Sequence, residues 1–116
     1  MRSTSKTTYK KGILAEYYAC AYLMLKGYRI LKLRYKTKVG EVDIVAKRFN
    51  TIAFIEVKYR DTLDNAIEAV TVKSQSRIRR ASEHYLLGSQ YESHIMRFDV
   101  IGIDKKFFIR HEQNVF

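Results

Sequence analysis

The chain has 116 residues, of which 47% are hydrophobic, so we expect neither a multidomain protein nor a chain that stays disordered for lack of apolar residues. Its 22 Lys and Arg against 12 Asp and Glu give a net charge of +10, which favours a polyanionic partner such as nucleic acid. The single cysteine, Cys20, excludes an internal disulfide and a multi-cysteine zinc site, and apolar runs are too short for a membrane span, so we expect a cytoplasmic protein without membrane segments.

The N-terminal end carries most of the excess charge. Residues 1–40 hold ten basic residues and one acidic residue, Glu16, whereas residues 41–116 hold twelve basic and eleven acidic residues. We therefore predict a flexible basic arm over residues 1–11, followed by a single folded domain over residues 12–116.

The first predicted element is a helix that begins at Gly12. The pair Lys26–Gly27 is a typical helix C-terminus. Glu16 lies on or beside the apolar face of this helix. Apolar side chains recur at helical spacing at Ile13, Tyr17, Cys20 and Met24.

Three strands are predicted next, because the spacing of apolar residues changes to a period of two. They are YRILKLRY, EVDIVAK and IAFIEVKY, at residues 28–35, 41–47 and 52–59. The last two are separated only by RFNT, a short polar turn, so they predict a β-hairpin.

The remainder predicts one helix and two strands. Residues 63–87 have helical periodicity, and Gly88 supplies a stop. MRFDVIGI and KFFIR, at residues 96–103 and 106–110, are predicted strands joined by a tight turn at Asp104 and Lys105. The order α-β-β-β-α-β-β predicts an α/β fold with a mixed β-sheet flanked by helices.

The predicted hairpin brings acidic residues together. Alternate side chains of a strand share a face, so Glu41 and Asp43 share one face of their strand, as do Glu56 and Lys58 of theirs. A two-residue turn at Phe49–Asn50, or a four-residue turn with the same register, places Asp43 opposite Glu56 and Glu41 opposite Lys58. Three carboxylates and one ammonium are therefore expected together on strands rich in apolar residues.

This acid cluster predicts a metal site. Adjacent carboxylates repel each other unless a cation lies between them, and Mg²⁺ or Mn²⁺ takes oxygen ligands. We expect Asp43, Glu56 and the backbone carbonyl of Val57 to hold such an ion, which would polarise a phosphodiester and activate a bound water. Lys58 would then face the attacked phosphate. Glu16 would serve as a further ligand or as a base that positions water.

Basic side chains around these elements predict contacts with nucleic acid. Because the chain has a large positive net charge, most of them lack an acidic partner and are available to phosphates. A solvated helix face is the alternative interpretation for Lys73, Arg77 and Arg80. Tyr35 and Tyr59 are candidate base-stacking residues. The predicted contacts are Arg34, Lys36, Lys38, Arg60, Lys73, Arg77 and Arg80.

Four further polar residues are interpreted as structural. The three histidines, His84, His94 and His111, share no metal-ligand spacing, so surface or local hydrogen-bonding roles are expected. Asp99 is expected to pair with a neighbouring arginine.

Two motifs give the sequence a family resemblance. VGEVDIVA, followed after a short gap by FIEVKYR, resembles the signature of PD-(D/E)XK nucleases. More narrowly, GILAEYYACAYLMLKGYRIL, GEVDIVA, FIEVKYR, AIEAVTVKSQSRIRRASEHYL and MRFDV resemble the YraN-type family of small endonuclease-like proteins, across residues 12 to about 103. The resemblance implies a restriction-endonuclease-like fold and metal-dependent hydrolysis of phosphodiester bonds in DNA.

The resemblance also implies roles for individual residues. Asp43 and Glu56 match the metal-binding acids and Lys58 the catalytic lysine. Glu16 matches the helix-borne acid of similar archaeal-type Holliday junction resolvases, which implies branched or junction DNA as substrate. Glu41 matches a further acid of the motif.

The chain departs from the family pattern at two positions. Ala15 stands where the family usually has Gly, and Arg34 where it has Asn, which bears on substrate contacts and not on the metal. The alternative function is a nucleic-acid-binding protein that keeps the nuclease fold without catalysis. A homodimer would place two sites on the two strands of DNA, with FFIR or Val115–Phe116 supplying apolar contacts.

Overall fold

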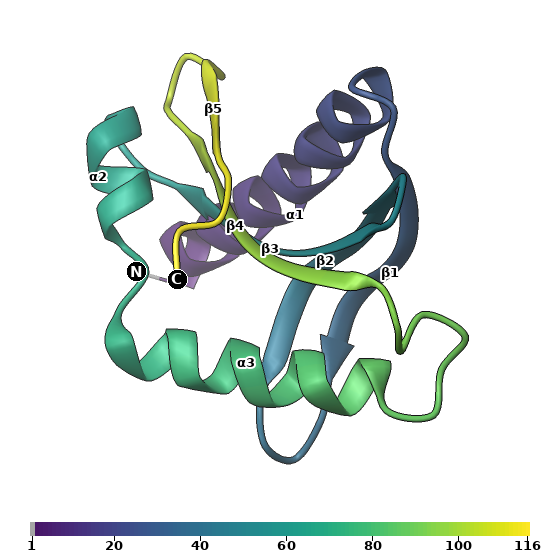
Figure 1. Ribbon diagram of the computed structural model, residues 1–116. Helices are drawn as coiled ribbons and strands as arrows, with labels where there is room; N and C mark the ends of the chain where they lie inside the picture. The colour runs from purple at the N-terminus through teal and green to yellow at the C-terminus, as the bar shows by residue number, and fades with distance from the viewer. Residues whose placement is uncertain (1) are drawn as a thin grey trace.

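A five-stranded sheet forms the middle layer of the molecule, with α1 on one face and α3 on the other (Figure 1). The computed structural model describes residues 2–116, with side chains from Lys10 onward. The predicted α/β class and mixed sheet are confirmed. The elements are α1 (Arg2–Leu25), β1 (Arg29–Lys36), β2 (Glu41–Arg48), β3 (Thr51–Tyr59), α2 (Leu63–Glu68), α3 (Val72–Leu86), β4 (Ile95–Ile103) and β5 (Ile109–Glu112).

The strands lie side by side in sequence order, from β1 to β5. Neighbouring strands are antiparallel except β3 and β4, which run parallel. A parallel pair needs a long crossover connection, and the chain supplies it through α2 and α3. The β2–β3 hairpin and the parallel pair therefore share β3 as the central strand.

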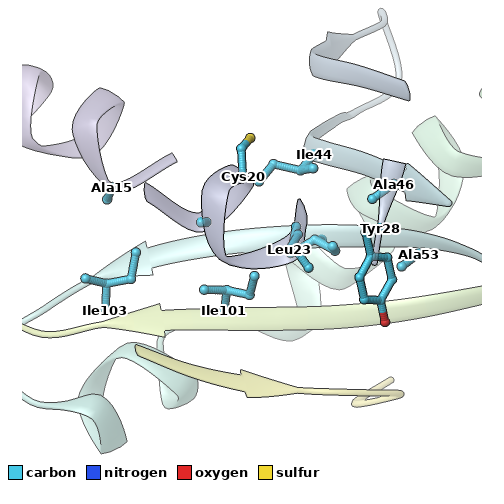
Figure 2. Close-up of a cluster of buried hydrophobic side chains, with 11 residues drawn as sticks. Ala15, Cys20, Leu23, Tyr28, Ile44, Ala46, Ala53, Ile101 and Ile103 are labelled. Carbon is cyan, nitrogen blue, oxygen red and sulfur yellow. The ribbon is translucent and has the colours of Figure 1, made fainter. Parts of the chain in front are cut away.

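Two apolar clusters attach the helices to the sheet. Figure 2 shows the first, in which side chains of α1 meet those of β2, β3 and β4. Its helix residues are Ala15, Ala19, Cys20 and Leu23. In the second cluster Ile78 and Ala81 of α3 pack against the opposite face, on Val45 and Phe54. The predicted packing role of Cys20 is confirmed, and burial raises the pKa of its thiol.

Helix α1 ends as predicted but begins earlier. Gly27 has φ +92°, and the N–H groups of Gly27 and Tyr28 donate to the carbonyls of Met24 and Leu23, the usual hydrogen bonds of a glycine helix end. The predicted start at Gly12 is wrong, because the helical backbone already begins at Arg2. Met1, the first residue of the predicted arm, lies outside the described residues. No helix in the described chain is long and apolar enough to cross a membrane.

The predicted helix over residues 63–87 is divided into α2 and α3. Each begins at a threonine whose side chain accepts a backbone hydrogen bond, Thr62 from Asn65 and Thr71 from Ser74. The Ser74 hydroxyl also receives the N–H of Thr71, which completes a capping box. The two caps start two separate helices, so one continuous helix was the wrong prediction.

The turn between β4 and β5 is longer than predicted. Asp104 accepts hydrogen bonds from the N–H groups of Lys106 and Phe108 through its carboxylate, and its own N–H donates to the carbonyl of Phe108. Phe107 has a left-handed φ of +63° within this turn. As a result β5 begins at Ile109, three residues later than the sequence predicted.

A buried polar network ties the end of α1 to β4 and β5. The carboxylate of Asp99 is fully buried. It accepts hydrogen bonds from Arg97 and from Nε2 of His111, each with a nitrogen–oxygen distance of 2.8 Å. The ammonium of Lys26 lies 2.8 Å from Nδ1 of His111 and can only donate, so the ring hydrogen of His111 lies on Nε2. Burial alone would raise the pKa of Asp99, but the hydrogen bonds from His111 and Arg97 outweigh it and lower the pKa. The predicted arginine pairing of Asp99 is confirmed.

Gly40 brings the turn between β1 and β2 against α3. A Cβ atom at this position would lie 1.9 Å from the backbone carbonyl oxygen of Arg77, a distance that forces the backbone to move. Only glycine therefore permits this contact. It places the turn that precedes Glu41 beside the basic face of α3.

We predict that Gly40→Ala lowers the free energy of unfolding by about 1–3 kcal/mol, the usual cost of overpacking. Gly12→Ala is the matched control, because a Cβ at Gly12 meets nothing within 4 Å. This control should raise the stability by about 0.5–1 kcal/mol, since alanine favours a helix interior. Urea unfolding of both variants measures the difference, and equal stabilities would contradict the close contact.

Candidate active site

The hairpin of β2 and β3 positions the predicted acids. Its turn consists of Phe49 and Asn50, and its ladder runs from the pair Arg48–Thr51 to the pair Ile44–Ile55. This confirms the predicted register. In that register Asp43 faces Glu56 one step beyond the last pair of the ladder. The two acids therefore lie where the backbone pairing of the hairpin ends.

Glu41 lies at the rim of this site. The predicted register also places Glu41 opposite Lys58, but the two form no backbone pair because the β2–β3 ladder ends at Ile44 and Ile55. On the other side of β2, the Cα partner of Glu41 is Lys36 of β1. Glu41 is exposed and lines the same cavity as Asp43, so it is available to solvent near the acid pair.

Asp43 and Glu56 interact directly in the space at the end of the ladder. The backbone N–H of Val57 donates a hydrogen bond to Oδ2 of Asp43, with a nitrogen–oxygen distance of 2.8 Å. This bond replaces the next backbone hydrogen bond of the ladder. Burial, together with the charge of Glu56 and a hydrogen bond to it, raises the pKa of Asp43 to about 8. At neutral pH the free pair therefore holds a proton between its two carboxyl groups.

Lys58 lies beside this pair on the same strand. It is two residues along β3 from Glu56, so both side chains leave the same face. Its Nζ lies 3.5 Å from Oε2 of Glu56, with the two side chains 22% and 13% exposed. The acid pair therefore has a cation at its edge that solvent still reaches.

Helix α1 contributes Glu16 to the site. This residue lines two neighbouring cavities of about 200 and 150 Å³, of which the first reaches Asp43 and the second Lys58. Nε of Arg34 donates to Oε1 of Glu16 over 2.7 Å. Burial raises the pKa of Glu16, the hydrogen bond from Arg34 opposes that rise, and the charge of Asp43 adds to it. The structure thus brings the predicted helix-borne acid to the predicted hairpin acids.

The carboxylates suit a small hard cation that keeps water ligands. Among the described residues, no group of three or more His, Cys, Asp or Glu side chains converges closely enough to hold a metal. Mg²⁺ usually takes one or two protein carboxylates and completes its octahedron with waters and phosphate oxygens. Asp43 and Glu56 supply two carboxylates, and a cation between them would neutralise the charge of Glu56 that helps to raise the pKa of Asp43. The residues present fit Mg²⁺ in this form.

The predicted nucleic-acid contacts lie around this site and along α3. Arg34 and Lys36 line the cavity at Asp43, and Arg60 lines the cavity at Lys58. The contact between Gly40 and Arg77 brings the basic face of α3 to the same end of the sheet. All seven predicted side chains are exposed: Arg34, Lys36, Lys38, Arg60, Lys73, Arg77 and Arg80.

The sequence prediction missed the pairing of Arg34 with Glu16. Arg34 has a left-handed φ of +51°, a conformation that asparagine adopts more readily than arginine. The expected family residue at this position, asparagine, therefore suits the backbone, whereas arginine adds a cation that reaches the helix. The departure from the family pattern was the available signal.

We predict that Asp43→Asn removes a pH dependence of stability. A carboxyl whose pKa is raised to about 8 on folding favours the folded state most below about pH 4, and this contribution is lost as the pH rises to 8. Between pH 4 and pH 8 the free energy of unfolding of the wild type should therefore fall more than that of Asp43→Asn. The expected difference between the two falls is on the order of a few kcal/mol. Urea unfolding in chelator across this range measures the difference, and a constant gap between the two proteins would contradict it.

Comparison with known proteins places the chain in a family. Residues 15–103, which include the four residues Glu16, Asp43, Glu56 and Lys58, match the family described as uncharacterised protein family UPF0102. A UPF0102 protein of Bradyrhizobium diazoefficiens is 48% identical over 89% of this chain and 78% of its own length. UPF0102 proteins of Rhodopseudomonas palustris and Sinorhizobium medicae are 47% and 45% identical, over 89% and 92% of this chain and 81% and 88% of their own lengths. The YraN-type resemblance is thereby confirmed, and the chain belongs to the UPF0102 family.

Proposed function

We propose that this protein is a metal-dependent endonuclease that hydrolyses phosphodiester bonds in DNA. The observation that carries the proposal is the convergence of Asp43, Glu56 and Lys58 at the end of the β2–β3 ladder, with Glu16 entering from α1. Two carboxylates that share a proton, next to a lysine and open to a basic surface, form a site for a cation and a phosphate. A purely structural cluster would gain nothing from placing these charges together.

Asp43 and Glu56 would hold Mg²⁺ or Mn²⁺, whose chemical contribution is to polarise the phosphodiester and to lower the pKa of a bound water. The N–H of Val57 points to Asp43. In a β-strand, the N–H and the C=O of the same residue point toward the same neighbouring strand. The Val57 carbonyl therefore faces the same space as the carboxylates. This direction supports it as a third oxygen ligand.

Lys58 would stabilise the negative charge that develops on the phosphoryl oxygens. Its ammonium is held at the edge of the acid pair by Glu56, so little reorganisation is needed when a phosphate oxygen arrives there. Its partial exposure leaves room for that oxygen. The lysine thus acts as a preorganised cation on the substrate side of the acids.

Glu16 would orient the attacking water. Its carboxylate lies between the cavity of Asp43 and the cavity of Lys58, and its raised pKa makes it a better proton acceptor than an exposed glutamate. Arg34 holds the carboxylate in one orientation. Binding of a phosphate by Arg34 would release Glu16 to the water.

The surrounding cations favour a nucleic-acid substrate, and the family resemblance favours branched or junction DNA. Exposed arginines and lysines on α3 and in the β1–β2 turn would contact backbone phosphates, which set position and affinity and carry no sequence information. We include Glu41 among the acids at the mouth of the site. The expected location is the cytoplasm.

A homodimer would allow both strands of a symmetric substrate to be cut. Phe116 is not available for its interface, because its ring stacks on Phe98 with centroids 5.2 Å apart. Phe108 is 63% exposed, and α1 carries exposed Leu14, Tyr17 and Leu25. An apolar interface would therefore draw on α1, the β4–β5 turn and Val115, whose side chain is 38% exposed.

A nucleic-acid-binding protein without catalysis is the second candidate. The ion pair between Glu16 and Arg34 favours it, because this carboxylate is occupied in the free protein. The two functions share the basic surface and differ only in turnover.

We predict that the wild type cleaves labelled branched or junction DNA in Mg²⁺ or Mn²⁺ and that Glu56→Ala abolishes the cleavage. The expected loss is at least 10²-fold, since the variant lacks one of two carboxylate ligands, while DNA binding persists. Product formation on linear, branched and junction substrates, with metal or with chelator, measures this. Glu68→Ala is the matched control, because Glu68 is exposed at the end of α2. Cleavage by the wild type that survives chelation would contradict the metal-dependent mechanism, and absence of cleavage by the wild type would leave the non-catalytic function.

We further predict that Lys58→Gln lowers kcat by roughly 10²- to 10³-fold with little change in KM, because its charge is needed when phosphoryl charge develops. Steady-state kinetics on the best substrate separates the two parameters. A rise in KM alone would show that Lys58 contributes to binding and not to the transition state.

A further inference from the structure

A basic cavity lies at the opposite end of the hairpin from the acid pair. Its lining residues come from the end of α1, the start of β1 and the β2–β3 turn. Figure 1 shows these three segments together at one side of the molecule. Four of its six lining residues are cationic and none is acidic. The cavity has a volume of about 430 Å³ and is lined by Lys26, Gly27, Arg29, Lys47, Arg48 and Phe49.

Contacts with neutral groups hold two of these cations, Lys26 and Arg48, in place. Within the described side chains, none of the four forms an ion pair with a carboxylate. Arg48 lies over the ring of Tyr28, 4.6 Å from its centroid, and donates to the carbonyl of Lys26. Lys26 in turn contacts His111. Burial and the charge of Arg48 lower the pKa of Lys26, as expected for cations that are crowded together. An anion would relieve this repulsion.

Phe49 at the tip of the hairpin is unfavourable for the free protein in two ways. Its side chain is 85% exposed, and its backbone has a left-handed φ of +55°, where asparagine or glycine is favoured. The ring lies beside Arg48, whose guanidinium is 5.9 Å from the ring centroid. A strained, exposed aromatic residue that fills no core position is grounds for a functional role.

The two tyrosines that the sequence suggested for base stacking are less available. Tyr35 is half-buried, its hydroxyl bonds to Nδ1 of His84, and its ring packs edge-on against Tyr85. Tyr59 is half-buried against the α1 cluster. Phe49 offers an open ring face beside cations, the combination that single-stranded nucleic acids bind.

We propose that this cavity binds the phosphate backbone of an unpaired nucleic-acid segment and that Phe49 stacks on one of its bases. The bases of a duplex are already stacked on each other, so a ring at a protruding turn gains a partner only where a base is unpaired. The inference deepens the proposed function and rests on it for the nucleic-acid partner. It does not depend on catalysis.

The position of the cavity defines the substrate further. Arg48 lies five positions along β2 from Asp43, which corresponds to roughly 17 Å at about 3.3 Å per residue. At roughly 3.4 Å per stacked nucleotide, this is about five nucleotides. The substrate is therefore DNA in which an unpaired segment lies about five nucleotides from the phosphodiester at the acid pair. Such segments occur at branches and frayed ends.

Phe49→Asn tests the inference because it should weaken the binding of single-stranded DNA while the stability of the protein stays the same or rises. Binding of labelled oligothymidylate of about 12 nucleotides, which exceeds the estimated spacing, is measured by fluorescence anisotropy in chelator. We expect roughly 5- to 100-fold weaker binding because one stacked base is lost, with binding of a duplex of equal length unchanged. We also expect stability at least equal to that of the wild type, since asparagine tolerates the left-handed backbone better.

Two further variants complete the test. Leu87→Asn removes another exposed apolar side chain, 78% exposed after the end of α3, and should leave oligothymidylate binding unchanged. Lys47→Gln should reduce the slope of log affinity against log salt by about 0.7, as expected for one lost phosphate contact on a single strand. Unchanged single-strand binding by Phe49→Asn, equal losses on single strand and duplex, or lower stability of Phe49→Asn would each overturn the inference. Because these measurements need no metal, a wild type that binds as expected but does not cleave would refute the proposed catalysis alone.

Discussion

The repulsion between the carboxyl groups of Asp43 and Glu56 is the constraint around which the candidate site is built. The hairpin register brings the two acids together, and the Val57 N–H holds Asp43 in place. Neither acid can move away without disturbing strands whose neighbouring residues, Ile44 and Ile55, are fully buried. The free protein accommodates the repulsion through a proton, as the raised pKa of Asp43 shows. A divalent cation would resolve it in the proposed nuclease.

Features controlled by local chemistry could be predicted from the sequence. The turn at Phe49–Asn50 determines the hairpin register, and with it the position of Asp43 opposite Glu56. Gly27 determines the end of α1 because few other residues adopt its left-handed backbone. Alternation of apolar residues was sufficient to locate the five strands, with boundary errors at β5.

Features that depend on contacts between distant segments could not be predicted. The ion pair of Arg34 with Glu16 needs the bulged course of β1 and the packing of α1 against the sheet. The contact of Gly40 with the Arg77 carbonyl needs α3 to lie across the β1–β2 turn. The break between α2 and α3 had a local signal in Thr71 and Ser74, but serine replaces the Glu or Gln of the usual capping box. The basic cavity beside Phe49 combines three segments and has no signature in any one of them.

The two ends of one hairpin therefore carry two different kinds of chemistry, an acid pair and a cluster of cations with an exposed ring. The central claim is that the proton held by Asp43 occupies the position of a metal ion. The most direct test is the number of protons released per bound Mg²⁺, obtained by calorimetry in buffers of different ionisation enthalpy. With a pKa of about 8 for Asp43, about one proton should be released per ion at pH 7 and almost none at pH 9. Failure to bind Mg²⁺, or a proton release that is the same at both pH values, would contradict the account.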